Sequence, residues 1–163
     1  MRRTWASIVA ASCLCLSVLS VRAQQPPPPL PAGSPRFDAC SLLTVAQIKA
    51  QLPWQAMFDK MPIERDDIGA AGSSCSYPTL IVQVLVFTPG FMDSARKRRP
   101  SEAVPGVGDD AFVSHNPQGY VELVARVGKW ALTLQGDIDK GGTYETAKPK
   151  TIALAKLAAA KLR

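Results

Sequence analysis

The sequence predicts an α+β fold, in which helices pack on an antiparallel β-sheet. Residues 80–87 form an apolar run rich in β-branched side chains, which is typical of a central strand. Two segments of alternating character flank Gly128 and predict a hairpin. Residues 151–162 are rich in alanine and leucine and predict a closing helix. Helices and strands grouped in this way favour an antiparallel sheet covered by helices.

The first 23 residues have the pattern of a secretory signal peptide. Arg2 and Arg3 precede an apolar run at residues 5–21, and Ala23 offers a small side chain for cleavage. This run of 17 residues includes four serines, whereas a helix that spans a bilayer needs roughly 20 apolar residues. We therefore expect an exported chain, periplasmic or extracellular, cleaved after Ala23. An uncleaved membrane anchor is the alternative.

Half of the net positive charge belongs to this segment. The 163 residues contain 19 lysines and arginines against 13 aspartates and glutamates, a net charge of +6. Removing residues 1–23 takes away three arginines and no acidic residue, which leaves +3. An exported domain with so little net charge is not expected to bind nucleic acid.

Residues 24–36 predict an extended linker, because six of these thirteen positions are prolines. The linker is a spacer or, alternatively, a ligand for a proline-recognising module. Any membrane tethering would then run only through this N-terminal part of the chain. Residues 37–163 remain, and their 127 positions suffice for one core but not for two.

The cysteine count points to one disulfide. Cys13 and Cys15 lie in the predicted signal peptide, so Cys40 and Cys75 remain. Two thiols in an exported chain allow one intramolecular bridge, here across a separation of 35 residues. Such a loop is stabilised by roughly 3.5–4 kcal/mol. Two free thiols, or a two-cysteine metal site without other soft ligands, are the alternatives.

The first half of the domain contains one clear helix and one clear strand. Residues 45–52 predict a helix, because Thr44 and Gln47 have capping-box spacing and Pro53 ends the pattern. Residues 65–74 predict a loop from their glycine, serine and aspartate content. The predicted central strand at residues 80–87 follows this loop.

The second half contains the hairpin and two further helices. A short helix begun by Asp93 is predicted between residues 91 and 99, and a strand at residues 111–114. The hairpin strands cover residues 119–127 and 129–136, joined at Gly128, which can adopt positive φ. The closing helix is predicted to begin near Pro149, a favourable first helical residue.

Three ordered motifs resemble an uncharacterised family of exported bacterial envelope proteins. Residues 38–44 read DACSLLT, residues 74–77 read SCSY and residues 105–112 read PGVGDDAF. The family pattern is D-P-C-x-L-L-T, then C-x-Y/W, then G-x-G-D-x-A-Y, so Ala39 and Phe112 depart from it. The resemblance implies that the two cysteines pair and suggests a PsbP-like α/β/α sandwich. It implies no reaction, and Gln24 stands where many members carry a lipid-modified cysteine.

Candidate catalytic and metal-binding residues do not form a convincing set. His115 follows Ser114, but neighbours in a strand point to opposite faces, and the next residues predict a turn. Asp109 and Asp110 could bind calcium, although turn or capping contacts are the simpler interpretation. Residues 137–148 begin like a calcium loop but end on Lys148 instead of glutamate. Glu122 is expected to be solvated, and we expect no cofactor or metal.

Two groups of side chains could bind a partner. Arg96, Lys97, Arg98 and Arg99 are the local cation cluster, which could attract an anionic polymer or an acidic protein partner, or could simply be solvated. Five aromatic residues could line a ligand groove between sheet and helices or could form the core: Trp54, Tyr77, Phe87, Trp130 and Tyr144.

The sequence therefore favours a non-catalytic exported domain that binds another component of the cell envelope, either a protein or an anionic polymer. The alternative is a binder of a small apolar or anionic ligand in a cleft between helix and sheet. An enzyme is the least favoured class, and a hydrolase using Asp109 or Asp110 would be its simplest form.

Overall fold

A computed structural model describes residues 37–52, 60–138 and 142–163. The predicted signal peptide, the predicted linker and Trp54 lie outside these residues. The helices are α1 Ala39–Leu42, α2 Val45–Gln51, α4 Phe91–Lys97 and α5 Tyr144–Leu162, with a short 3₁₀ turn at Gly69–Ala71. The strands are β1 Glu64–Asp67, β2 Gly72–Tyr77, β3 Leu80–Val86, β4 Ser101–Ala103, β5 Asp110–Asn116, β6 Tyr120–Val127 and β7 Trp130–Asp137.

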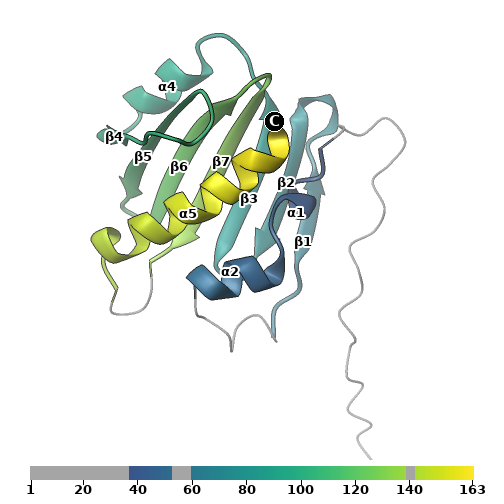
Figure 1. Cartoon of the computed structure of the whole chain (residues 1–163), viewed down its shortest axis with the longest axis vertical. Coiled ribbons are helices and arrows are strands. Elements are labelled where there is room, and N and C mark those ends of the chain that lie inside the picture. Colours follow the sequence, from purple (N-terminus) through teal and green to yellow (C-terminus); the bar gives the residue numbers. More distant parts are fainter. Residues whose placement is uncertain (1–36, 53–59, 139–141) are drawn as a thin grey trace, which may run out of the picture.

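The described strands form one antiparallel sheet of seven strands in the order β1-β2-β3-β7-β6-β5-β4 (Figure 1). β1, β2 and β3 form one meander, and β4 to β7 form a second. The two meet where β3 pairs with β7, and Val82 lies opposite Leu134 at this junction. The last strand of each meander therefore lies at the centre of the sheet.

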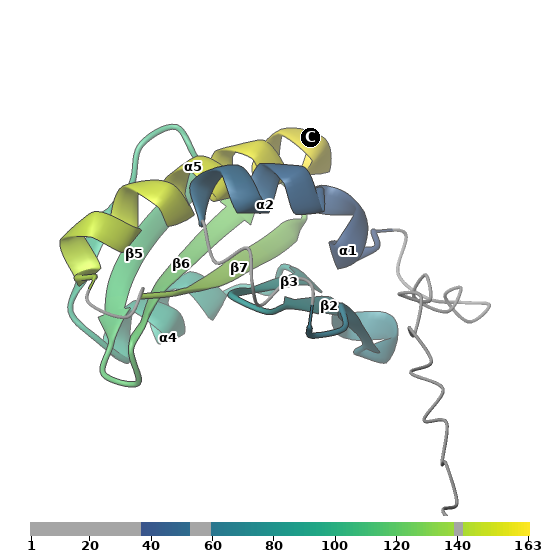
Figure 2. The ribbon, with the colours of Figure 1, turned by 90° about the horizontal axis from the view of Figure 1, so that it is seen from below.

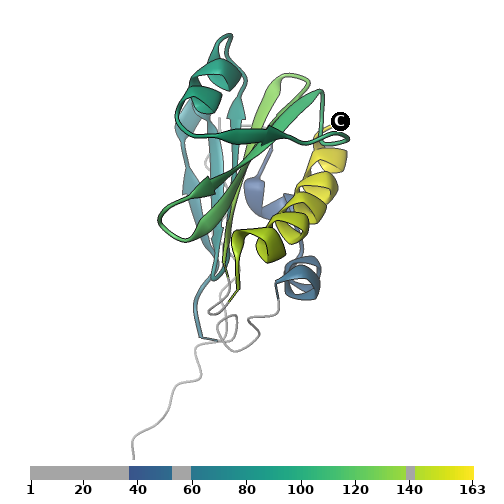
Figure 3. The ribbon, with the colours of Figure 1, turned by 90° about the vertical axis from the view of Figure 1, so that its left-hand side faces the viewer.

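Helices cover both faces of the sheet. α1, α2 and α5 lie on one face and α4 lies on the other (Figures 2 and 3). The larger core lies under α5, where Leu154 and Ala158 pack among sheet residues such as Leu123. A smaller cluster lies under α4 and contains Met92, Ala95, Phe112 and Val124. The predicted α+β class with an antiparallel sheet packed by helices is confirmed, and so is the disulfide between Cys40 and Cys75.

Residues 65–74 are not a loop, so this prediction was wrong. They contain most of β1 and the first half of β2, joined by the 3₁₀ turn. Gly72 is required at the start of β2, because a Cβ there would lie 1.9 Å from the Val84 carbonyl oxygen. Small polar residues suggested a loop, yet pairing of β2 with β3 places them in the sheet.

The closing helix begins earlier than predicted, and Pro149 lies inside it. Thr143 and Thr146 form a capping box that starts α5 at Tyr144. Pro149 removes one intrahelical hydrogen bond near the start of a long helix whose later turns are buried against the sheet. The α4 boundary also differs, because Gly90 is the N-cap and Asp93 lies within the first turn.

Other predicted elements lie within a few residues of their expected positions, including α2 with its Thr44–Gln47 capping box and the hairpin of β6 and β7. Gly128 has the expected positive φ of 57°. Among the described residues, no helix is long and apolar enough to cross a membrane.

Candidate functional site

A hollow of about 550 Å³ opens at one end of the sheet. Four parts of the chain that are distant in sequence meet there: Phe37, the turn before β5, the turn between β6 and β7, and the end of α5. We call this cavity the hollow, and it is lined by Phe37, Asp109, Val127, Gly128, Lys129, Trp130, Leu162 and Arg163.

Two aromatic rings form part of the wall of the hollow. The edge of the Phe37 ring meets Trp130, with ring centroids 5.0 Å apart and planes at 81°. The Lys129 ammonium nitrogen Nζ lies 5.3 Å from the centre of the Trp130 ring, on the solvent side. Trp130 is itself buried, and Val127 and Leu162 complete the apolar lining. The hollow thus combines an apolar wall with charged groups at its rim.

The G-x-G-D turn at residues 106–109 supports the hairpin that forms the hollow. Gly108 has a φ of 62°, and a Cβ there would lie 2.1 Å from the Arg126 carbonyl oxygen. The Asp109 carboxylate accepts a hydrogen bond of 2.7 Å from the Gly128 amide. The Arg163 guanidinium donates to the Gly108 carbonyl at 3.3 Å. Asp109 therefore holds the hairpin turn, as the turn interpretation of this residue predicted.

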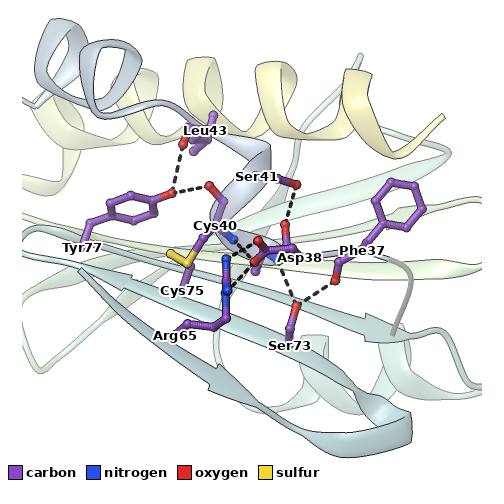
Figure 4. Close-up of polar contacts among 10 residues, drawn as sticks. Phe37, Asp38, Cys40, Ser41, Leu43, Arg65, Ser73, Cys75 and Tyr77 are labelled. Atoms are coloured by element: carbon purple, nitrogen blue, oxygen red, sulfur yellow. Dashed lines mark hydrogen bonds and ion pairs between the residues drawn. A yellow bond between two sulfur atoms is a disulfide. The ribbon is translucent and has the colours of Figure 1, made fainter. Parts of the chain in front are cut away.

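Phe37 is positioned by a group of contacts that we call the N-terminal clamp: Asp38, Cys40, Arg65, Ser73 and Cys75 (Figure 4). The disulfide joins Cys40 of α1 to Cys75 of β2, with Cα atoms 5.0 Å apart. The Asp38 carboxylate caps α1 by accepting from the Cys40 amide at 2.9 Å, and it pairs with the Arg65 guanidinium.

Ser73 fixes the backbone beside the Phe37 ring. Its hydroxyl donates to the Phe37 carbonyl at 2.9 Å and accepts from the Ala39 amide at 3.0 Å (Figure 4). Ser73 is fully buried, so both hydrogen bonds are shielded from water. The N-terminal clamp thus sets the position of the wall of the hollow.

Tyr77 supports the same segment from the other side of the disulfide. Its hydroxyl lies 2.9 Å from the Leu43 carbonyl oxygen and 3.2 Å from the Cys40 carbonyl oxygen (Figure 4). Burial, followed by the negative charge of Asp38, raises the pKa of Tyr77 from its usual 10.0 to about 12. The phenol therefore stays neutral and remains a donor at physiological pH.

Replacing Tyr77 with phenylalanine is expected to lower the free energy of unfolding by about 1 kcal/mol near neutral pH, through the lost hydrogen bond. Because the folded pKa lies above the unfolded value, the contribution of the neutral phenol is fully present below about pH 10. It is lost as the pH rises towards 12. The difference in the free energy of unfolding between wild type and Tyr77→Phe should therefore become smaller at alkaline pH. Urea unfolding at about pH 8 and about pH 11.5 measures it.

Tyr120→Phe is the control for that experiment, because the Tyr120 hydroxyl makes only an exposed contact with Gln118. Its difference from wild type should be small. If the loss of unfolding free energy in Tyr77→Phe is the same at about pH 8 and at about pH 11.5, burial does not raise the pKa of Tyr77 as described.

The predicted cation cluster divides into two paired and two exposed residues. The Arg96 guanidinium lies 2.5 Å from the Asp110 carboxylate and stacks 5.0 Å from the Phe112 ring centre. The Arg99 guanidinium lies 2.5 Å from the Glu122 carboxylate. Lys97 and Arg98 are exposed at the end of α4. The partner-binding role of the four residues stays a prediction.

Glu122 is not solvated, so this expectation was wrong. Its side chain is 10% exposed, pairs with Arg99 and lies 3.5 Å from the Gln135 amide nitrogen. The alternating pattern of β6 correctly predicted a polar position, but α4 and the residues after it cover that part of the sheet.

Ser114 and His115 do not form a catalytic pair. Ser114 is buried, whereas His115 is exposed and its ring lies 5.1 Å from that of Tyr144 in α5. The opposite orientation of the two neighbours is confirmed. The turn predicted after His115 is present at residues 117–119, but His115 itself lies in β5, which extends to Asn116. Within the described residues, no group of three or more histidine, cysteine, aspartate or glutamate side chains could hold a metal ion.

The predicted aromatic groove is found only in part. Tyr77 and Trp130 are buried in the core, while Phe87 packs beside α4 with the Arg126 guanidinium 4.8 Å from its ring centre. Tyr144 is half-buried, and Trp54 lies outside the described residues. Of the four candidates that the structure describes, only Trp130 lines the hollow. Its partner Phe37 was not among the candidates, and the isolated aromatic position gave no signal for it.

Comparison of the chain with protein-family models, with curated proteins and with solved structures found no match.

Proposed function

We propose that this chain is an exported, non-catalytic domain that binds another component of the cell envelope, with the hollow as its binding site. The observation that carries the proposal is the composition of the hollow. An apolar wall with a few charged groups at the rim, in a volume of several hundred Å³, is typical of ligand sites.

Two observations support the exported and non-catalytic parts of the proposal. The disulfide of the N-terminal clamp is a feature of proteins that leave the reducing cytoplasm, and the first 23 residues have the pattern of a signal peptide. The carboxylates considered for hydrolysis are engaged elsewhere, Asp109 with Gly128 and Asp110 with Arg96. An enzyme would need an acid, a base and a nucleophile that converge.

The resemblance to the exported envelope family belongs to the same proposal. The first two motifs supply the two cysteines and Asp38 of the N-terminal clamp, and the third supplies Gly108 and Asp109 beside the hollow. A PsbP-like sandwich remains the proposed relation of the fold. In this proposal the motifs preserve the wall of a binding site and not a reaction centre.

Site-specific photo-crosslinking in the intact envelope tests the proposed function. A photo-crosslinking phenylalanine derivative replaces Lys129 at the hollow, and in a control chain it replaces exposed Lys60 before β1. We expect a discrete adduct, identified by mass spectrometry, from position 129 and none from position 60. Equal labelling at both positions, or none at 129, would contradict the proposal.

Lys97 provides a third position for the same experiment. Lys97 and Arg98 are exposed and have no ion pair among the described contacts, which favours this surface as a second candidate for an anionic polymer. An adduct from position 97 but not from position 129 would show that the partner binds at the end of α4 and not in the hollow.

A further inference from the structure

We infer that the hollow takes a negatively charged amphiphile, that is, an acyl or aryl body that carries a carboxylate or phosphate group. This inference rests on the proposed function and names the chemical class of the ligand. It follows from three features of the lining: the apolar wall, the excess of positive side chains, and the hydrogen bond that the Asp109 carboxylate accepts from Gly128.

The apolar body would lie against the two rings. Phe37 and Trp130 meet edge to face, and Val127 and Leu162 extend this surface. The backbone at Phe37 is held through Ser73, so the wall is formed before any ligand arrives. An alkyl or aryl group seated there would be removed from water, which is the main driving force for such binding.

The rim favours a negative head group. Of the lining residues, Lys129 and Arg163 carry positive charge and Asp109 carries negative charge. The Asp109 carboxylate and the Arg163 guanidinium each have a hydrogen-bond partner in the backbone, the Gly128 amide at 2.7 Å and the Gly108 carbonyl at 3.3 Å. The Lys129 side chain is exposed and its ammonium nitrogen lies over the Trp130 ring, so this group can turn towards an anion in the hollow. An incoming carboxylate or phosphate would therefore meet cations, with the apolar wall behind it.

Three probes with the same ten-carbon chain and different head groups test the ligand class: decanoate, decyltrimethylammonium and decyl maltoside, each kept below its micelle concentration. Protein recovered from the cell envelope is titrated with each probe, and the amide signal of Gly128 and the indole signal of Trp130 are followed by NMR. We expect both signals to shift, with decanoate binding tightest. Concentrated salt should weaken this preference, because the rim is open to solvent.

Lys129→Ala and Lys60→Ala form the matched pair of variants. Loss of Lys129 should weaken decanoate binding about fivefold more than it weakens decyl maltoside binding. Loss of Lys60 should change neither. Phosphatidylglycerol vesicles in place of decanoate distinguish a lipid in a membrane from a free amphiphile, since only the former would bring the protein to the vesicles.

The outcomes separate the two proposals. Equal affinity for all three probes would overturn the charge class and leave the hollow as a binding site. Tighter binding of the cationic probe would do the same. If no probe shifts Gly128 or Trp130, the amphiphile inference is wrong, and the crosslinking experiment at position 129 decides the proposed function on its own.

Discussion

Replacing both cysteines with alanine, as Cys40→Ala/Cys75→Ala, is expected to lower the free energy of unfolding by about 3.5–4 kcal/mol. The bridge closes a loop across 35 residues, and its loss restores that much conformational freedom to the unfolded chain. This is a large share of the roughly 5–15 kcal/mol by which domains are stable. Asp38, Arg65 and Ser73 should still hold α1 against the sheet in the folded variant.

Urea unfolding of the double variant and of wild type measures the loss, and wild type treated with a dithiol reductant is the control. The reduced wild type and the double variant should agree to within about 1 kcal/mol, because Cys75 is fully buried and alanine leaves only a small space. A loss below about 1 kcal/mol would show that the polar contacts of the N-terminal clamp suffice without the covalent bond.

Gly108→Ala is expected to destabilise the domain by about 3–5 kcal/mol or to prevent folding. At a φ of 62° any L side chain is strained, by roughly 1–2 kcal/mol, and here the added Cβ would also lie 2.1 Å from the Arg126 carbonyl oxygen. That oxygen belongs to the β6 backbone and accepts from the Asp109 amide at 2.8 Å, so neither partner can move independently.

Gly128→Ala is the matched control, since Gly128 has a similar φ of 57° but no atom within 4 Å of an added Cβ. Gly128→Ala should lower the free energy of unfolding only by the backbone strain, about 1–2 kcal/mol. Thermal unfolding of both variants against wild type gives the comparison. Similar losses for the two variants would mean that close packing of the G-x-G-D turn against the hairpin is unimportant.

The elements with strong local patterns could be predicted from the sequence. The apolar run of β3, the alternation on both sides of Gly128 and the Thr44–Gln47 capping box each depend on neighbours in the chain. The cysteine count predicted the disulfide because only Cys40 and Cys75 lie outside the predicted signal peptide. These features together were enough for the α+β class.

The missed elements depend on contacts between distant residues. β2 begins Gly72-Ser73-Ser74, a composition that favours a loop, and becomes a strand because β1 and β3 pair with it on both sides. Glu122 has the pattern of an exposed residue but is covered when Arg99 reaches it from the segment after α4. The start of α5 could have been found from the Thr143–Thr146 spacing, but Pro149 gave the stronger local signal.

The hollow could not be predicted, because no single segment contains it. Phe37 and Arg163 come from opposite ends of the described chain, and Lys129 comes from a turn between them. The sequence suggested an aromatic cleft between helix and sheet, and Trp130 was the one candidate that belongs to it. The Phe37 side of the hollow depends on where the disulfide and Ser73 hold the backbone of Phe37.

The bridge between α1 and β2 also determines how the domain responds to mechanical tension. A pull applied through the residues before Phe37 reaches Cys40 and passes through the sulfur atoms directly to Cys75 in the sheet. The 34 residues between them, which include α2 and β1, do not carry this force. Without the bridge, this segment could be pulled to an extended length of about 120 Å, at roughly 3.4 Å per residue. Force exerted from the N-terminal side is therefore passed to β2 at Cys75 once the contacts of Phe37 and Ala39 with Ser73 are broken.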